Sequence, residues 1–345
     1  MRSKKGYILT EILTGLYLQA AIILTMAAAL SWLLSFQIKS VEILTARSHD
    51  NNFFAYLEPR IKNCGLGLFK CVSADNENIL KLAFDADGRY TAPNLEGFIN
   101  SLVIFENLTD YGLKETAREN EHGIICGHVL GILYTMPLQN VLIQTRWGLE
   151  DKINPGNSFE YLLYTTKQLE DFSGVSMDIR SWCVLPTVGV PFLALQTKNK
   201  NKKDVLRITL AKNFGRSLKI PPVSEVFEVR AEFFYVTQSE NGVADENFSS
   251  TLRRISPRFD TAHQHYLMNN PMEDGILETY FELDKKSKTL DVYILSYAGD
   301  YVSFNTSQKN SKPKSWPDNA NWNDEYLRYE LFVNMKSFKL DNVIF

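Results

Sequence analysis

The chain has little of several features that mark specialised proteins. It contains only four Cys in 345 residues, and its formal net charge is −3. So few cysteines exclude a small disulfide-packed fold, and 45% hydrophobic residues exclude a disordered or collagen-like chain. The near-neutral charge gives no reason to expect nucleic acid as a partner.

Common catalytic motifs are also missing. The sequence has no Gly-x-Ser-x-Gly nucleophile motif, no phosphate-binding P-loop and no His-Glu-x-x-His zinc motif. Its acidic residues are scattered and do not suggest a catalytic pair. We therefore expect a structural or assembly protein that is not an enzyme and needs no cofactor.

Charge is nearly absent from residues 7–38, YILTEILTGLYLQAAIILTMAAALSWLLSFQI, in which Glu11 is the one charged residue. The run is long enough to cross a bilayer as a helix, which needs about 20 apolar residues. Basic residues precede it, so the positive-inside rule predicts a cytoplasmic N-terminus and an exported body. Three interpretations compete: a cleaved signal peptide with Ala27–Ala29 as its small-residue site, a plain single-pass anchor, or a stem that assembles with other stems.

Glu11 separates these interpretations, because a carboxylate at mid-bilayer costs about 2.5–3.5 kcal/mol on insertion scales. A signal peptide or a plain anchor gains nothing from it. The residues Lys4-Lys5-Gly6-Tyr7-Ile8-Leu9-Thr10-Glu11 resemble the prepilin motif of type IV pilin-like proteins, with Tyr in place of the commoner Phe and Thr10 in place of an aliphatic residue. The resemblance implies that a prepilin peptidase cleaves after Gly6 and N-methylates Tyr7, which makes Glu11 the fifth mature residue.

Such a cleavage would leave a cationic amine at Tyr7 inside an apolar helix bundle. A buried charge needs a partner, and in a staggered stack Glu11 of one subunit can reach the amine of its neighbour. The pair would set the register more than it adds stability. Glu11→Ala should therefore damage assembly and leave the exported head folded.

Helical spacing of apolar residues continues past the membrane run, through Val41, Leu44, Phe54 and Leu57. No Gly or Pro interrupts the chain between Gly15 and Pro59. The spacing predicts one helix whose second half is amphipathic and packs on a head. A shorter anchor followed by a separate helix is the alternative, with the break in the SHDNN segment.

The domain organisation expected from these patterns has three parts. Residues 1–6 form a leader, residues 7–58 a transmembrane and stem helix of about 75 Å, and residues 59–345 an exported head. The predicted fold class is α+β, with the hydrophobic stem helix packed onto a β-rich head in a lollipop shape.

Alternating apolar and polar residues predict that the head consists mainly of strands, packed as two sheets. A hairpin with a Lys-Lys-Ser-Lys tip is expected within 277–300, and the polar 307–323 segment should be a loop with Trp316 and Trp322 as tucked aromatic anchors. Further strands are expected at 141–147, 205–212, 226–238 and 326–338.

The head also shows a resemblance. Several segments resemble large minor pilins of the PilW-like group. They are the stem exit YLEPRIKNCGLGL, the strand VRAEFFYVTQ with the following Thr251-Leu252-Arg253-Arg254, and the late ILETYFELD and LDVYILSY strands. The resemblance implies a minor pilin or pseudopilin that helps to initiate, cap or functionalise a type IV pilus or a type II secretion pseudopilus.

The partners that follow are other pilins or pseudopilins, the prepilin peptidase and an inner-membrane assembly platform. The expected location is the inner membrane, with the head exported, and the filament after assembly. The alternative function is that of a single-pass, membrane-anchored exported binding protein or enzyme with no filament role.

The predicted topology places all four cysteines outside the cytoplasm, where disulfides persist. Cys64 and Cys71 enclose a short Gly-containing loop and are the favoured pair, and Cys126 with Cys183 follows by elimination. Four cysteines allow three connectivities, so the pairing stays open. Buried thiols are the alternative.

Two segments resemble incomplete metal sites. His122, Cys126 and His128 lie close together but lack a fourth ligand for zinc. Asp85 begins a DADG segment in which Glu96 falls twelfth, as in a calcium loop, yet Arg and Pro occupy intervening positions. A plain Asp-Gly turn is the expectation, and calcium is the alternative.

Overall fold

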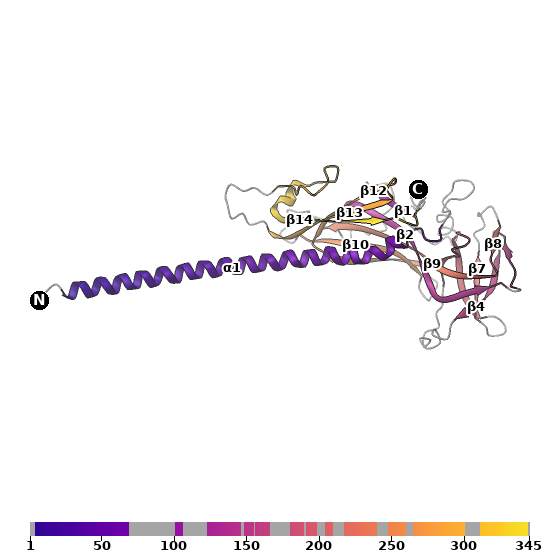
Figure 1. The fold of residues 1–345 in the computed structure, drawn as a ribbon, viewed down its shortest axis with the longest axis horizontal. Helices are drawn as coiled ribbons and strands as arrows, with labels where there is room; N and C mark the ends of the chain where they lie inside the picture. Colours follow the sequence, from indigo (N-terminus) through magenta and orange to yellow (C-terminus); the bar gives the residue numbers. More distant parts are fainter. Residues whose placement is uncertain are drawn as a thin grey trace.

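The computed structural model describes residues 4–68, 101–105, 123–145, 148–154, 156–165, 180–189, 191–198, 204–209, 217–239, 248–259, 265–300 and 311–343. Over these ranges, one long helix projects from a β-rich head, and the N-terminus lies far from the head (Figure 1). The predicted α+β organisation is confirmed.

Helix α1 spans Lys4–Lys62 without a break and contains 59 residues, which corresponds to about 90 Å at 1.5 Å per residue. The alternative of two separate helices is wrong, because the SHDNN segment stays helical within α1. The helix also continues four residues beyond the predicted end at Glu58 and includes Pro59. Arg60 and Lys62 in the last turn favour this end, since cations stabilise the negative end of the helix dipole.

The described strands form sheets of nine, three and two strands. In chain order they are β1 Leu102–Phe105, β2 Ile124–Gln144, β3 Asp151–Ile153, β4 Ser158–Thr165, β5 Arg180–Val184, β6 Pro191–Lys198, β7 Asp204–Thr209, β8 Leu218–Ile220, β9 Val223–Gln238, β10 Ser250–Phe259, β11 His265–Asp274, β12 Ile276–Asp284, β13 Thr289–Asp300 and β14 Tyr329–Lys339, with the short 3-10 helix η5 Asp324–Arg328 before β14.

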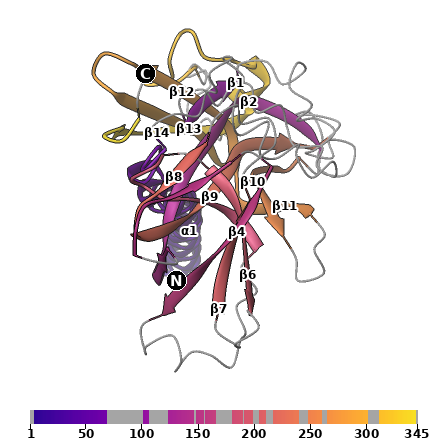
Figure 2. The same ribbon diagram turned by 90° about the vertical axis from the view of Figure 1, so that its right-hand side faces the viewer.

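The far end of the head is a closed barrel. The antiparallel pairings run from β2 to β4, β7, β6, β5 and β9, and β9 pairs back onto β2, so that six strands form a ring. In Figure 1, β4 and β7 of this ring lie at the end of the head away from the N-terminus, and Figure 2 shows the head from that end. The barrel interior holds a separate core that includes Ile143, Tyr161, Phe192, Leu206 and Val226. Closure leaves this part of the sheet without exposed edges.

The end of the head nearer the stem has two layers and the helix. Strands β2 and β9 extend beyond the barrel and carry β1, β10 and β11, while β12, β13 and β14 form the second sheet. The last part of α1 contacts β13, β14, β11 and β2. One core joins helix and sheets, in which Phe53, Phe54, Leu57 and Ile61 of the helix pack with residues such as Phe234.

Residues 311–328 cover the other face of the β12–β14 sheet. Trp316 is buried there beside Tyr280, and its indole N–H donates to the carbonyl of Asn321 at 3.0 Å. Trp322 packs at the border of the same cluster and donates to Asp324. The predicted role of both tryptophans as tucked anchors is confirmed.

Most of the predicted strands are present. The 226–238 strand is β9, and the hairpin within 277–300 is β12 and β13 joined by a turn at 285–288. The 141–147 strand is only the last part of β2, which begins at Ile124. The earlier part of β2 is apolar on both faces, and such a run cannot be told from a buried helix by periodicity.

Candidate assembly surface and its anchor

The first half of α1 is an apolar surface that the chain itself does not cover. All described side chains from Thr10 to Ile38 are exposed. This segment, here called the apolar half, carries large hydrophobic side chains around the whole helix, with exposed fractions from 49% at Leu33 to 72% at Tyr17. It includes Ile12, Leu16, Ile22, Leu24, Met26, Leu30, Trp32, Phe36 and Ile38.

Such a surface is unfavourable in water. Each buried Leu, Ile or Phe gains about 1.5–3 kcal/mol relative to exposure, so the apolar half is better suited to lipid or to a bundle of apolar helices than to water. Within the described residues, α1 is the one helix long and apolar enough to cross a membrane, with a mean hydropathy of 1.9 in a window that is 0% buried. Core helices of globular proteins that are equally apolar are buried in their own fold, unlike this one.

The residues of the prepilin-like motif lie at the start of this surface. Gly6 and Tyr7 belong to the first turns of α1, and the described side chains begin at Thr10. Glu11 is exposed on the helix, among apolar residues. The geometry therefore leaves the carboxylate of Glu11 accessible to a partner outside the chain.

The second half of α1, residues 39–62, is called the docked half because it packs on the head. Phe54 and Leu57 are buried as the helical spacing predicted, with exposed fractions of 4% and 0%. Val41 and Leu44 were expected on the same face, but they are 62% and 63% exposed. The apolar surface thus extends beyond Ile38 on the side of the helix that faces away from the head.

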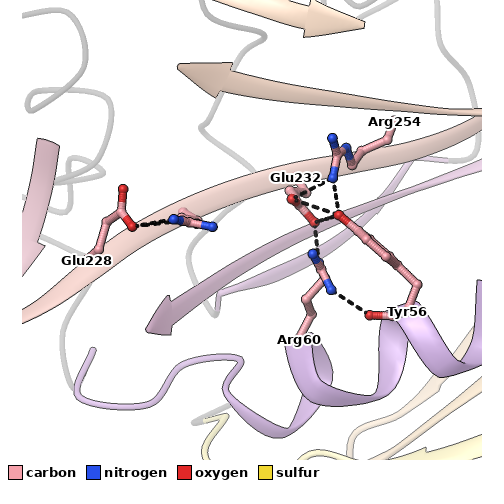
Figure 3. Close-up of polar contacts among 6 residues, drawn as sticks. Tyr56, Arg60, Glu228, Glu232 and Arg254 are labelled. Atoms are coloured by element: carbon pink, nitrogen blue, oxygen red, sulfur yellow. Dashed lines mark hydrogen bonds and ion pairs between the residues drawn. The ribbon is translucent and has the colours of Figure 1, made fainter. Parts of the chain in front are cut away.

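A polar cluster, here called the clamp, fixes the end of the docked half to the sheet. Arg60 Nε donates to Glu232 Oε2 at 2.7 Å, and Tyr56 Oη donates to Glu232 Oε1 at 3.2 Å. Arg254 Nη1 lies 3.5 Å from Glu232 Oε1 and donates to Tyr56 Oη. Figure 3 shows the four side chains converging from α1, β9 and β10.

The clamp is largely shielded from water. Glu232 is 3% exposed, and the Arg60 and Arg254 side chains are 18% and 14% exposed. The Arg60 guanidinium also lies 3.3 Å from the centre of the Tyr56 ring, a cation–π arrangement. Burial, and then the Glu232 charge, raise the pKa of Tyr56 above its ordinary value, so its hydroxyl remains a neutral donor. A second pair, Glu228 with Arg230 at 2.6 Å, continues the charged row on β9.

The sequence did not reveal the clamp. Its one local signal is Glu232, an ionisable residue in the middle of the apolar VRAEFFYVTQ strand, which predicts a buried partner. The partners lie 172 residues earlier and 22 residues later, at Arg60 and Arg254, and only the tertiary structure brings them together.

The cysteines fall in different parts of the head. Cys64 is buried and donates its thiol hydrogen to the carbonyl of Ser101 at 3.1 Å, and Cys71 lies outside the described residues. Cys126 is opposite Val236 of β9, whereas Cys183 is opposite Glu228. Eight strand residues separate these positions, about 26 Å. The expected Cys126–Cys183 pair is therefore wrong, since bonded cysteines have Cα atoms within about 7 Å.

The candidate metal residues are only partly described. His122, Asp85 and Glu96 lie outside the described residues. His128 is buried in β2, and its ring packs against Tyr280 in a tilted arrangement, with centroids 4.6 Å apart. Among the described residues, no group of three or more His, Cys, Asp or Glu side chains could hold a metal ion.

An open cleft of about 700 Å³ lies at the barrel end of the head, lined by residues that include Asp151 and Phe159. Its lining residue Glu160 is paired with Arg207 at 2.6 Å, and Glu150 is paired with Lys219 at 3.0 Å. These carboxylates are thus compensated by cations of the chain itself, and they do not form a site that awaits a ligand.

Comparison of the chain with protein-family models, with curated proteins and with solved structures found no match. The features that bear on function are therefore the motif at residues 4–11, the exposed apolar half and the clamp.

Proposed function

We propose that the chain is a membrane-anchored, pilin-like subunit, a minor pilin or pseudopilin that assembles through its stem helix. The observation that supports it best is that the prepilin-like motif lies in the first turns of a continuous helix whose next residues form an exposed apolar surface. The subunit would help to initiate, cap or functionalise a type IV pilus or a type II secretion pseudopilus. It would be a substrate of prepilin peptidase and a partner of other pilin-like subunits.

The physical basis is that the surface of the apolar half suits both a lipid bilayer and a bundle of apolar helices. The apolar half from Ile12 to Ile38 extends about 40 Å, longer than the bilayer core of about 30 Å, so it can span the membrane with tilt. Lipid tails and a bundle of apolar helices are similarly apolar. Transfer from the bilayer into a filament core therefore changes the hydrophobic free energy little, and assembly can be directed by polar contacts.

Glu11 would supply the main directing contact. Cleavage after Gly6 creates a positive amine at Tyr7, and Glu11 of an adjacent stem offers the opposite charge in an apolar surrounding. A buried pair of this kind fixes register even when it adds little net stability. The exposed position of Glu11 on α1 is consistent with this role.

The head would follow the stem out of the membrane. The clamp and the apolar core around Phe53 and Leu57 connect α1 to both sheets, so movement of the stem out of the membrane carries the head with it. The barrel lies at the end of the head away from the N-terminus (Figure 1), so it would be the part of the subunit furthest along the direction of the stem.

Mass spectrometry of the mature N-terminus tests the proposal. The protein is purified from cells that express it with a prepilin peptidase, and we expect a chain that begins with N-methylated Tyr7. Gly6→Val should abolish cleavage. Gly15→Val is the matched control, because Gly15 lies on the same helix with open space around it and should leave cleavage unchanged.

Two other results would contradict the proposal. An intact Met1 would indicate a plain anchor, and a mature chain beginning near Ser31 would indicate a signal peptide. Either would favour a membrane-anchored or secreted binding protein or enzyme over a filament subunit.

A further inference from the structure

The docked half of α1 is held to the head in two different ways. From Phe53 to Lys62 it is fixed by the apolar core and the clamp. From Lys39 to Asp50 only Ala46 and Asp50 are buried. This earlier part, here called the seam, therefore depends mainly on polar contacts.

The described polar contacts of the seam reach three strands. Lys39 pairs with Glu330 of β14 at 3.0 Å, with both side chains more than a quarter exposed. His49 Nδ1 lies 3.3 Å from Glu273 of β11. Asp50 accepts a hydrogen bond from Ser296 of β13 at 2.7 Å.

Asp50 is the unusual member of the seam. It is 0% exposed, and its second oxygen, Oδ2, accepts no hydrogen bond from the residues that the structure describes. An ionised carboxylate in such a place is costly unless it is fully paired. A protonated carboxyl suits the same place, because it is uncharged.

The helix is also intrinsically weak at this position. The residues Ser48-His49-Asp50-Asn51-Asn52 all have low helix propensity. They separate the seam from the firmly docked Phe53. If the polar contacts of the seam open locally, the opening should therefore end at residues 48–52, and the apolar core around Phe53 should stay packed.

We propose that the docking of residues 39–50 on the head depends on the protonation of Asp50. With Asp50 protonated, these residues are held against β11, β13 and β14. With Asp50 ionised, they detach more readily, while residues 53–62 stay docked. The device would let the head change its orientation relative to the stem according to the pH outside the cell. It stands independently of the filament role.

The direction in which pH changes the opening of the seam follows from the coupling between proton binding at Asp50 and opening. Burial is the main cause that raises the pKa of Asp50 from 3.8 to about 6, opposed by the hydrogen bond from Ser296 and by the nearby amide of Asn334. The closed seam then binds a proton that the open seam releases, so opening becomes more favourable as pH rises from about 4 to about 6 and levels off above that. Between pH 5 and pH 8 the opening equilibrium should rise about tenfold.

The charged groups around Asp50 come from each packed element. His49 lowers and Glu273 raises its pKa through their charges. Lys39 and Glu330 form the exposed pair at the other end of the seam, and the carbonyl of Asp274 contacts the His49 ring at 3.1 Å. These groups modulate the effect, but only Asp50 is fully buried.

Hydrogen exchange measured by mass spectrometry on the full chain in detergent micelles tests the proposal. After correction for the intrinsic exchange rate, peptides from residues 39–50 should lose about tenfold protection between pH 5 and pH 8. Peptides from residues 53–62 should change much less. Asp50→Asn should abolish the pH dependence in the seam, and Glu42→Gln, an exposed acid on the same helix, should leave it intact.

Two outcomes would overturn the proposal: corrected protection of the seam that is equal at pH 5 and pH 8, or a pH dependence that persists in Asp50→Asn. Should Asp50→Asn fail to fold, the wild-type comparison of residues 39–50 with residues 53–62 still decides the question. Equal pH responses in these two parts would contradict a local seam.

Discussion

The two halves of α1 share one backbone conformation but differ in the burial of their side chains. In the apolar half, Leu24 is 70% exposed, whereas in the docked half Leu57 is 0% exposed. Leu is an equally good helix former in both places. The comparison shows that helix formation was a local property of the sequence, while burial depended on whether the head supplied a partner surface.

The largest difference in the free energy of unfolding is expected between a buried and an exposed carboxylate, Glu232 and Glu160. Glu232→Ala removes the carboxylate of the clamp and leaves Arg60 and Arg254 without their common partner. Loss of one member of a buried charged cluster costs about 3–5 kcal/mol. Urea unfolding of the full chain in micelles, followed by Trp fluorescence, should show this loss.

The matched control is Glu160→Ala, which removes a carboxylate paired with Arg207 where both side chains are at least 40% exposed. A surface pair contributes about 0–1 kcal/mol. Similar losses for Glu160→Ala and Glu232→Ala would mean that the clamp does not anchor the helix.

A second contrast uses the same substitution in both halves of the helix. Leu57→Ala should lower the free energy of unfolding of the head by about 2–5 kcal/mol, because a cavity opens in the shared core. Leu24→Ala should leave it unchanged, since Leu24 is 70% exposed and lies outside the core that the described residues of the head form. The same urea experiment measures both variants, and an equal effect of the two would refute the division into halves.

A third, smaller contrast concerns a buried acid in the head. Glu278 is 5% exposed and accepts a hydrogen bond from Tyr326 Oη at 2.8 Å. Burial raises its pKa from 4.5 to about 7, so the folded head retains a proton that the unfolded chain releases. The free energy of unfolding should fall as pH rises from about 4.5 to about 7, by up to about 3 kcal/mol.

Glu278→Gln keeps an acceptor for Tyr326 and removes the charge. The variant should be more stable than the wild type at pH 8 and should lose this part of the pH slope, measured by urea unfolding at pH 5 and pH 8. Glu282→Gln, an exposed acid on the same strand, should retain the wild-type slope. Parallel profiles for wild type and Glu278→Gln would contradict the assignment.

Local patterns predicted the helix and several strands because their causes are local. The absence of Gly and Pro from residues 16–58 predicted a continuous helix, and the β12–β13 hairpin followed from two alternating runs around a polar tip. The first part of β2 was not predicted as a strand. Strands buried on both faces show no alternation, so the pairing with β9 and β1 defines it.

The candidate sites also divide into those that local spacing predicted and those that depend on the tertiary structure. Gly6, Tyr7 and Glu11 were selected from spacing alone, since the motif is contiguous, and their role remains a proposal. The pair Cys126 and Cys183 was wrong, because elimination among cysteines takes no account of the strand register that separates them. The exposure of Val41 and Leu44 was also missed, since periodicity cannot say how far a head extends along a helix.

The sequence by itself determined a β-rich head and a long helix whose apolar half carries a single charge, that of Glu11. These features depend on the composition and spacing of neighbouring residues. Only the tertiary structure decided that β2 and β9 close a barrel, that Glu232 joins Arg60 and Arg254, and that Asp50 is buried against Ser296. The reason is physical: burial, pairing and pKa depend on residues that lie far apart in the chain and meet only in the folded head.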